Sequence, residues 1–121
     1  MAPARSFTYA GATLVVERSG GGHPVYVLIH GIGMGRSIFA DLEEHLDDSA
    51  RVVAIDLPGY GEAPEPARVL TMERTADLVA AYLRAHVASP AVLVGHSMGA
   101  QVALEVDAAV FMREFVARLT R

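Results

Sequence analysis

The apolar residues of the chain form short, nearly continuous runs that alternate with longer stretches of helical periodicity. The runs "VYVLIH" at 25–30, "RVVAI" at 51–55 and "AVLV" at 91–94 are typical of strands buried on both faces, as parallel strands are. Near the N-terminus, "FTYAGATLVVE" places β-branched and aromatic residues around Gly11-Ala12, which predicts two short strands joined by a tight turn. These patterns predict an antiparallel hairpin followed by parallel strands.

Between and after the predicted parallel strands, the apolar residues recur at the spacing of a helix. The first helix is predicted after "GIGMGR", where four apolar residues recur at this spacing: Ile38, Phe39, Leu42 and Leu46. Thr71 suits the N-cap of a second helix, whose apolar positions step by three or four residues through Met72, Ala76, Val79, Leu83 and Val87. A third helix follows "AVLV". This order of elements predicts an α/β fold with a mostly parallel sheet.

The length and composition fit a single globular domain over residues 1–121. Hydrophobic residues make up 52% of the chain and charged residues 20%, without a low-complexity tract or an internal repeat. A chain of this size buries roughly two-thirds of the surface that its unfolded form exposes. A second domain is not expected.

Charge, cysteine content and hydropathy exclude several classes of protein. The formal net charge is −4 and the arginines are scattered singly, which argues against a nucleic-acid partner. The chain has no cysteine for disulfides or thiolate metal sites. It has no apolar run near the roughly 20 residues that span a bilayer, and no apolar segment of the kind a secretory signal needs. We expect a cytoplasmic protein that has no membrane partner.

Two further patterns resemble metal or phosphate sites and are better explained by structure. In "DLEEHLDD", four residues with metal-binding side chains fall at helical spacings: Asp41, Glu44, His45 and Asp48. Carboxylates on a solvated helix face are common, so this pattern favours an exposed face and no metal. The glycines of "RSGGGH" precede no helix start, so they indicate a flexible turn and no phosphate site.

The loop "IHGIGMGRS" presents the geometry of a dinucleotide site, with Asp56 at the end of the next predicted strand. A G-x-G-x-x-G pattern that starts at Gly31 requires Gly or Ala where Arg36 stands. Asp56 is also followed at once by the Pro-Gly turn "LPGYG". The mismatch disfavours a nicotinamide or flavin site, and no cofactor is expected.

The sequence "GHSMG" places Ser97 between Gly95 and Gly99, after a short apolar strand and before a predicted helix. This is the strand, sharp turn and helix of a nucleophile elbow. Such a turn strains the serine backbone, and side chains at the two glycines would collide with the neighbouring strand and helix. The arrangement holds the hydroxyl clear of the sheet, where the positive end of the helix dipole faces any oxyanion.

With this elbow, the chain resembles the N-terminal half of an α/β-hydrolase, over about residues 7–106. "HGIG" at 30–33 is similar to the family's loop after its third strand, and "DLPGYGEAP" at 56–64 to the turn after its fourth strand. Three motifs in the family's order carry the resemblance. It implies a small-molecule substrate with an ester, thioester, amide or related carbonyl bond, and a serine that forms an acyl-enzyme.

The resemblance also implies roles for individual residues. Ser97 corresponds to the nucleophile, and the backbone N–H groups of Ile32 and Met98 correspond to the oxyanion hole. Two histidines are expected to shape the loop and to anchor the elbow rather than to act as general base. The resemblance thus gives these two histidines and three glycines a supporting role in the site: His30, Gly31, Gly95, His96 and Gly99.

The residues after Ser97 depart from the family's order of serine, acid and histidine. Three acids follow Ser97, namely Glu105, Asp107 and Glu114, and no histidine follows it. A serine hydroxyl without a base is a poor nucleophile. The alternative function is therefore an inactive hydrolase remnant that acts as a binding module.

The tail "VDAAVFMREFVARLTR" has helical spacing, which predicts a C-terminal helix over 107–121 in an incomplete domain that lacks the family's C-terminal strands. The tail fits either an internal deletion near Val106, which joins the family's last helix to the elbow helix, or one long elbow helix. In both cases no strand follows 91–94. An exposed apolar edge strand invites pairing, which predicts a homo-oligomer through strand 91–94.

Overall fold

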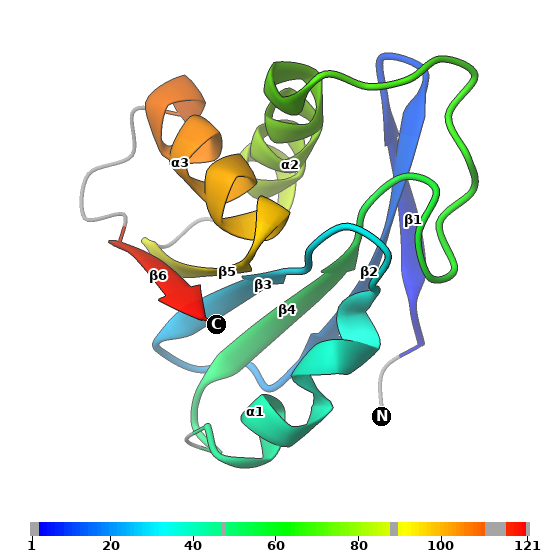
Figure 1. Cartoon of the computed structure of the whole chain (residues 1–121). Coiled ribbons are helices and arrows are strands. Elements are labelled where there is room, and N and C mark those ends of the chain that lie inside the picture. The colour runs from blue at the N-terminus through cyan, green and yellow to red at the C-terminus, as the bar shows by residue number, and fades with distance from the viewer. Residues whose placement is uncertain (1–2, 47, 88–89, 111–115, 121) are drawn as a thin grey trace.

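Within the residues that the computed structural model describes, which are 3–46, 48–87, 90–110 and 116–120, six strands form one mixed sheet. Their order across the sheet is β1-β2-β4-β3-β5-β6 (Figure 1). The strands are β1 (Arg5–Tyr9), β2 (Ala12–Ser19), β3 (Val25–Ile29), β4 (Arg51–Asp56), β5 (Ala91–His96) and β6 (Val116–Thr120). The β1-β2 and β2-β4 pairs are antiparallel and the other pairs are parallel, so the predicted α/β fold with a mostly parallel sheet is confirmed.

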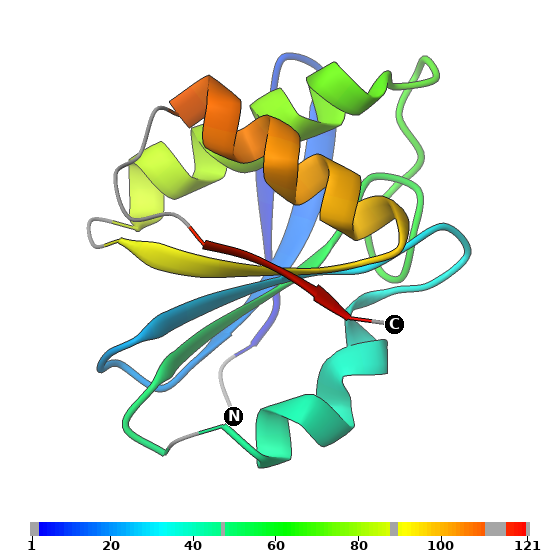
Figure 2. The same cartoon turned by 60° about the vertical axis from the view of Figure 1, so that its left-hand side comes forward.

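Helices cover both faces of the sheet, as Figure 2 shows. Helices α2 (Met72–His86) and α3 (Met98–Val110) lie side by side on one face, and α1 (Ala40–Glu44) lies on the other, after the 3-10 helix η1 (Arg36–Phe39). Thr71 caps α2 as predicted, because its Oγ1 accepts a hydrogen bond of 3.1 Å from the N–H of Arg74. No helix in these described ranges is long and apolar enough to cross a membrane.

Successive residues of the central strands enter different halves of the core. Val27 and Ile29 of β3 belong to the larger cluster, which α2 and α3 cover. Leu28, between them, belongs to a smaller cluster with Phe39 from η1. Strand β3 is therefore buried on both faces, as its apolar run predicted.

The hairpin turn lies one residue earlier than Gly11-Ala12. Ala10 and Gly11 form it, with φ values of 52° and 84°. A type I′ turn needs positive φ at both central residues, so glycine takes the second position rather than the first. The Oγ1 atoms of Thr8 and Thr13 lie 2.8 Å apart across the strands that flank the turn.

We expect the Ala10→Asn substitution to stabilise the protein by about 0.5–1 kcal/mol, because alanine is strained in this left-handed conformation and asparagine tolerates it. Urea unfolding measures the effect. The matched control is Gly11→Ala, where an added Cβ meets no atom within 4 Å and only the backbone conformation is penalised. This control should destabilise the protein by about 1 kcal/mol. A loss of stability in Ala10→Asn would contradict the assignment of the turn.

The tail differs from the prediction. Helix α3 ends at Val110, and residues 116–120 form strand β6, so the prediction of a helix over 107–121 is wrong for β6. Residues 111–115 and 121 lie outside the described residues. Because β6 pairs with β5 from Val92 to His96, the prediction of an exposed edge at 91–94 is also wrong. The predicted homo-oligomer through strand 91–94 loses its structural basis, since β3 and β6 occupy the two sides of β5.

Candidate active site

Ser97 lies at the turn between β5 and α3 with a φ of 57°, a left-handed conformation that is rare for a residue with a side chain. The N–H of Ala100 donates a hydrogen bond of 3.0 Å to the Ser97 carbonyl and closes this turn. Strain of this kind costs about 1–3 kcal/mol and is found at functional sites. The side chain of Ser97 is exposed, so its hydroxyl is accessible to a substrate.

The two glycines of the elbow allow backbone segments to approach closely. A Cβ at Gly95 would lie 2.4 Å from the Gly99 oxygen and 2.5 Å from the Ala100 nitrogen. A Cβ at Gly99 would lie 2.0 Å from the carbonyl oxygen of Ile29, at the end of β3. The first turn of α3 thus sits directly on the sheet, and this contact fixes the position of Ser97.

The loop over residues 30–36 passes beside Ser97 on its way from β3 to η1. A Cβ at Gly31 would lie 3.0 Å from Ser97 Cβ and 3.5 Å from Ser97 Oγ. Ile32 follows in this loop with an exposed side chain, and Met98 begins α3 on the other side of the serine. The Met98 N–H is among the first four of the helix, which have no acceptor within it.

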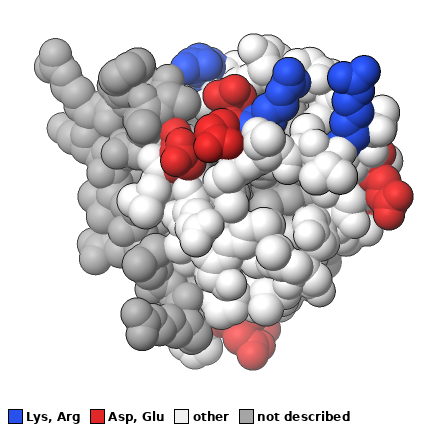
Figure 3. Space-filling model, turned by 45° about the horizontal axis from the view of Figure 1, so that its top comes forward, with Lys and Arg blue, Asp and Glu red and all other residues white. Residues whose placement is uncertain are grey.

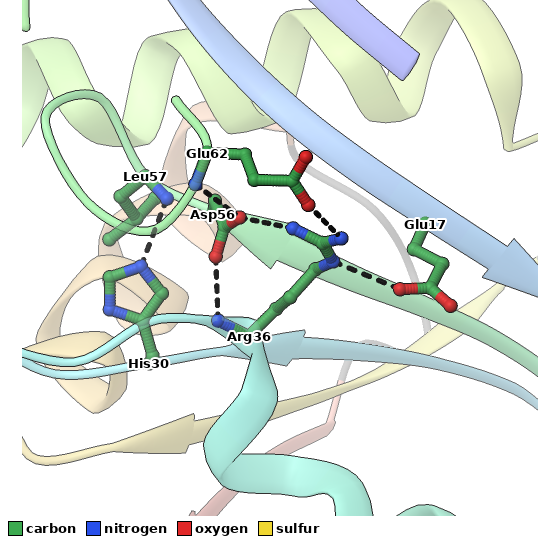
Figure 4. A network of polar contacts seen from close by, with 6 residues as sticks. All are labelled: Glu17, His30, Arg36, Asp56, Leu57 and Glu62. Atoms are coloured by element: carbon green, nitrogen blue, oxygen red, sulfur yellow. Dashed lines mark hydrogen bonds and ion pairs between the residues drawn. The ribbon is translucent and has the colours of Figure 1, made fainter. Parts of the chain in front are cut away.

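His30 is fully buried, and both of its ring nitrogens are engaged. Its Nδ1–H donates to the Gly31 carbonyl at 2.7 Å. Its Nε2 accepts from the Leu57 N–H at 2.9 Å (Figure 4). The ring of Tyr60 meets it edge-on, with 5.2 Å between the ring centroids. The two partners require the neutral Nδ1–H tautomer. His30 therefore joins the loop to the end of β4 and has no free nitrogen to serve as a base for Ser97.

Burial lowers the pKa of His30, and the hydrogen bond to Gly31 and the charge of Asp56 offset this effect in part. Protonation at Nε2 would also replace the hydrogen bond from Leu57 by repulsion between two N–H groups, those of His30 and Leu57. Because the folded-state pKa lies below the ordinary histidine value of 6.5, the unfolded chain binds more protons than the folded chain as the pH falls below 6.5. The contribution of His30 to stability is therefore present above this pH and is lost below it.

We predict that the free energy of unfolding falls more steeply between pH 7 and pH 5 in the wild type than in His30→Gln, which cannot titrate at this position. Urea unfolding across this range measures both profiles. His23→Gln, at an exposed histidine, is the matched control and should retain the wild-type slope. Parallel profiles for the wild type and His30→Gln would show that His30 is not held neutral.

An ion-pair network that was not predicted from the sequence lies beside this loop. Arg36 Nε lies 3.0 Å from Glu17 Oε1, and Arg36 Nη2 lies 2.6 Å from Glu62 Oε1. Its Nη1 pairs with Asp56, whose side chain is 1% exposed (Figure 4). The signal in the sequence was the arginine at a position where the dinucleotide pattern requires a small residue.

Both oxygens of the Asp56 carboxylate are bound by groups of the protein itself. Its Oδ1 accepts from the Arg36 N–H at 2.7 Å, and its Oδ2 accepts from the Glu62 N–H at 3.0 Å. A Cβ at Gly61 would lie 2.3 Å from Oδ1, so the chain packs directly against the acid. Asp56 has no room to hold a ribose, which agrees with the sequence argument against a dinucleotide.

Two of the remaining candidate residues lie on β5 and α3. His96 is half-buried at the end of β5, beside Ser97, and Glu105 is exposed on α3. Nothing is described for the side chain of Asp107, and Glu114 lies outside the described residues. On the acidic helix, His45 Nδ1–H donates to the Asp41 carbonyl at 2.7 Å. Across the part of the chain with described positions, no three acidic, histidine or cysteine residues are grouped to hold a metal.

A family model described as the alpha/beta hydrolase family matches residues 26–119, from β3 into β6. The chain belongs to the alpha/beta hydrolase family. Over 92 residues the chain is 42% identical to a pimeloyl-(acyl-carrier protein) methyl ester esterase of Methylococcus capsulatus, covering 76% of the chain and 34% of the esterase.

Solved structures show the same relationship. An N-acyl homoserine lactonase in complex with N-butanoyl homoserine superposes with a TM-score of 0.82 and 28% identity, over 95% of this chain and 44% of the lactonase. A thermophilic esterase from Thermogutta terrifontis superposes with a TM-score of 0.75 and 32% identity, over 88% of the chain and 41% of the esterase. The chain therefore spans less than half the length of these relatives.

A groove of about 500 Å³ lies next to the elbow and is lined by both apolar and polar residues. Its apolar lining includes Met98, Leu57 and Val69, and its charged lining residues are Glu65 and Arg68. The side chain of Val69 is 97% exposed, although it is apolar. Figure 3 shows the top of the molecule in Figure 1 turned forward; its charged side chains lie mainly toward the upper rim and leave the centre uncharged.

Proposed function

We propose that this chain carries the nucleophile of a serine hydrolase, which cleaves an ester, thioester, amide or related carbonyl bond through an acyl-enzyme. The single observation that carries the proposal is the exposed Ser97, held at a φ of 57° between β5 and α3. Its Oγ attacks the carbonyl carbon of the substrate, and the alcohol, thiol or amine leaves with a proton. Water then releases the acid.

Stabilisation of the negative charge on the substrate oxygen is assigned to the backbone. The loop at Gly31 and the start of α3 at Met98 lie on two sides of Ser97, so the N–H groups of Ile32 and Met98 are the proposed donors. The positive end of the α3 dipole adds to this stabilisation. One such donor is typically responsible for about a 10²–10³-fold rate increase.

The groove next to Met98 is the proposed site for the apolar part of the substrate. Apolar side chains make up much of its lining, and Met98, one of its lining residues, follows the nucleophile directly in the chain. The similar proteins include an esterase that acts on a methyl ester and a lactonase bound to an N-butanoyl compound. We therefore propose a small ester or lactone with an aliphatic chain as the substrate class, and we retain the cytoplasm as the proposed location.

We propose that a group other than His30 supplies the base for this reaction. No histidine follows Ser97 in the sequence, and both nitrogens of His30 are bound. Removal of the histidine impairs both acylation and deacylation in a serine triad. A chain that has been acylated without this base should therefore hold its acyl group instead of turning over.

Intact-mass analysis after exposure to p-nitrophenyl butyrate at pH 9 tests the proposal. We expect one butyryl group per folded wild-type chain and none on Ser97→Ala, with folding of both samples checked by circular dichroism. Equal modification of the two proteins would contradict the assignment of Ser97 as the nucleophile.

A binding module is the second candidate function, and the engaged nitrogens of His30 favour it. A folded wild type that gains no butyryl group in the same experiment would support this candidate. The groove would then serve to bind an apolar ligand without cleaving it.

A further inference from the structure

The loop over residues 30–36 is attached at both ends to consecutive residues at the end of β4. At its start, His30 Nε2 accepts from the Leu57 N–H at 2.9 Å. At its end, the Arg36 N–H donates to Asp56 Oδ1 at 2.7 Å. These two bonds hold the two ends of the loop against one short piece of the sheet (Figure 4).

The guanidinium of Arg36 ties this end of the loop to three separate segments. It pairs with Glu17 on β2, with Asp56 at the end of β4 and with Glu62 in the following turn. The arginine side chain is 16% exposed and uses three different nitrogens. A planar fork with several donors can hold three carboxylates at fixed angles, which a lysine ammonium on a flexible stem does less well.

The packing around the Arg36 guanidinium and Asp56 leaves the loop over residues 30–36 little room to move. A Cβ at Gly35 would lie 3.0 Å from Asp56 Oδ1, and one at Gly61 would lie 2.4 Å from Asp56 Cγ. The loop and the turn thus press on the acid from two sides. A shift of the Arg36 guanidinium would therefore move Gly35, and with it the backbone of the loop beside Ser97.

We propose that Arg36 is a positioning residue, which fixes the place of the Ile32 N–H relative to Ser97 Oγ by holding the end of the loop. This inference rests on the proposed function, because the Ile32 N–H matters only if an oxyanion forms at Ser97. A misplacement of about 1 Å at a reacting centre can lower a rate about a hundredfold. Arg36 acts through the backbone and does not touch the substrate.

The test measures two properties of the same variants. The first is the rate at which an alkyl fluorophosphonate modifies Ser97, with imidazole as the added base. The limiting rate and the half-saturating concentration of the fluorophosphonate are determined separately. The second is the set of backbone order parameters for residues 31–35, measured by NMR. Arg36→Gln removes the charge of the side chain. Arg36→Lys keeps a positive charge beside Asp56, so it is the variant more able to fold. The matched control is Arg5→Gln, at an exposed arginine on β1.

We expect the limiting rate to fall about a hundredfold in Arg36→Gln and about tenfold in Arg36→Lys, with the half-saturating concentration unchanged. The order parameters of residues 31–35 should fall from about 0.85 toward 0.6 in both variants, while those of β3 and β4 stay at the wild-type level. Arg5→Gln should match the wild type in both measurements.

Two results would overturn the inference. One is loop order in folded Arg36→Lys equal to that of the wild type, and the other is a loosened loop with an unchanged limiting rate. A wild type that is not modified at all contradicts the proposed function instead, and the order parameters still decide whether Arg36 holds the loop.

Discussion

Replacing Gly99 with alanine should destabilise the protein by more than about 4 kcal/mol, which is a large part of the stability of a typical domain. The new Cβ would lie 2.0 Å from the Ile29 oxygen and 2.6 Å from the His30 oxygen. Both atoms belong to the backbone at the end of β3, so no flexible side chain can move aside. The first turn of α3 would have to separate from the sheet.

Urea unfolding followed by circular dichroism measures this loss. Gly21→Ala is the matched control, because a Cβ there meets no atom within 4 Å and the backbone φ is ordinary. We expect this control to stay within about 0.5 kcal/mol of the wild type. A stable, folded Gly99→Ala protein would contradict the close contact between the elbow helix and β3.

The second large effect is expected at Asp56. Its buried carboxylate accepts from two backbone N–H groups and pairs with Arg36. An asparagine would offer one oxygen and an NH₂ group to these donors, and Arg36 would lose its buried partner. Breaking one side of a buried ion pair costs about 3–5 kcal/mol, which is the loss we expect for Asp56→Asn.

Glu62→Gln is the control for this second prediction. It removes a charge from the same network at a side chain that is 67% exposed. Exposed ion pairs contribute about 0–1 kcal/mol, so this variant should unfold at nearly the same urea concentration as the wild type. Equal losses in the two variants would show that burial of Asp56 does not set the strength of the network.

Features encoded by neighbouring residues could be predicted from the sequence. The glycines of "GHSMG" and the apolar strand before them indicate a nucleophile elbow, and Ser97 takes the strained φ that such a turn requires. Thr71 marks the start of α2 because an N-cap acts within three residues. The hairpin was predicted one residue out of place, because the choice between Gly-X and X-Gly depends on the turn type.

Features that depend on distant partners could not be predicted in this way. Arg36 meets Glu17, Asp56 and Glu62 at separations of 19, 20 and 26 residues. The arginine stands out where the glycine pattern requires a small residue, but nothing in the neighbouring sequence identifies its three partners. The tail was assigned to a helix because its apolar residues have helical spacing. Strand β6 forms there because the edge of β5 presents backbone groups that need partners, which local periodicity does not encode.

The mass of the protein after exposure to a fluorophosphonate tests our claim that Ser97 is nucleophilic. The reaction is followed at increasing imidazole concentrations and the modified residue is located by peptide mapping, with Ser97→Ala as the control. We predict one adduct per chain on Ser97, formed faster as imidazole supplies the missing base, and none on the control. A folded wild type that stays unmodified at every imidazole concentration would contradict the claim.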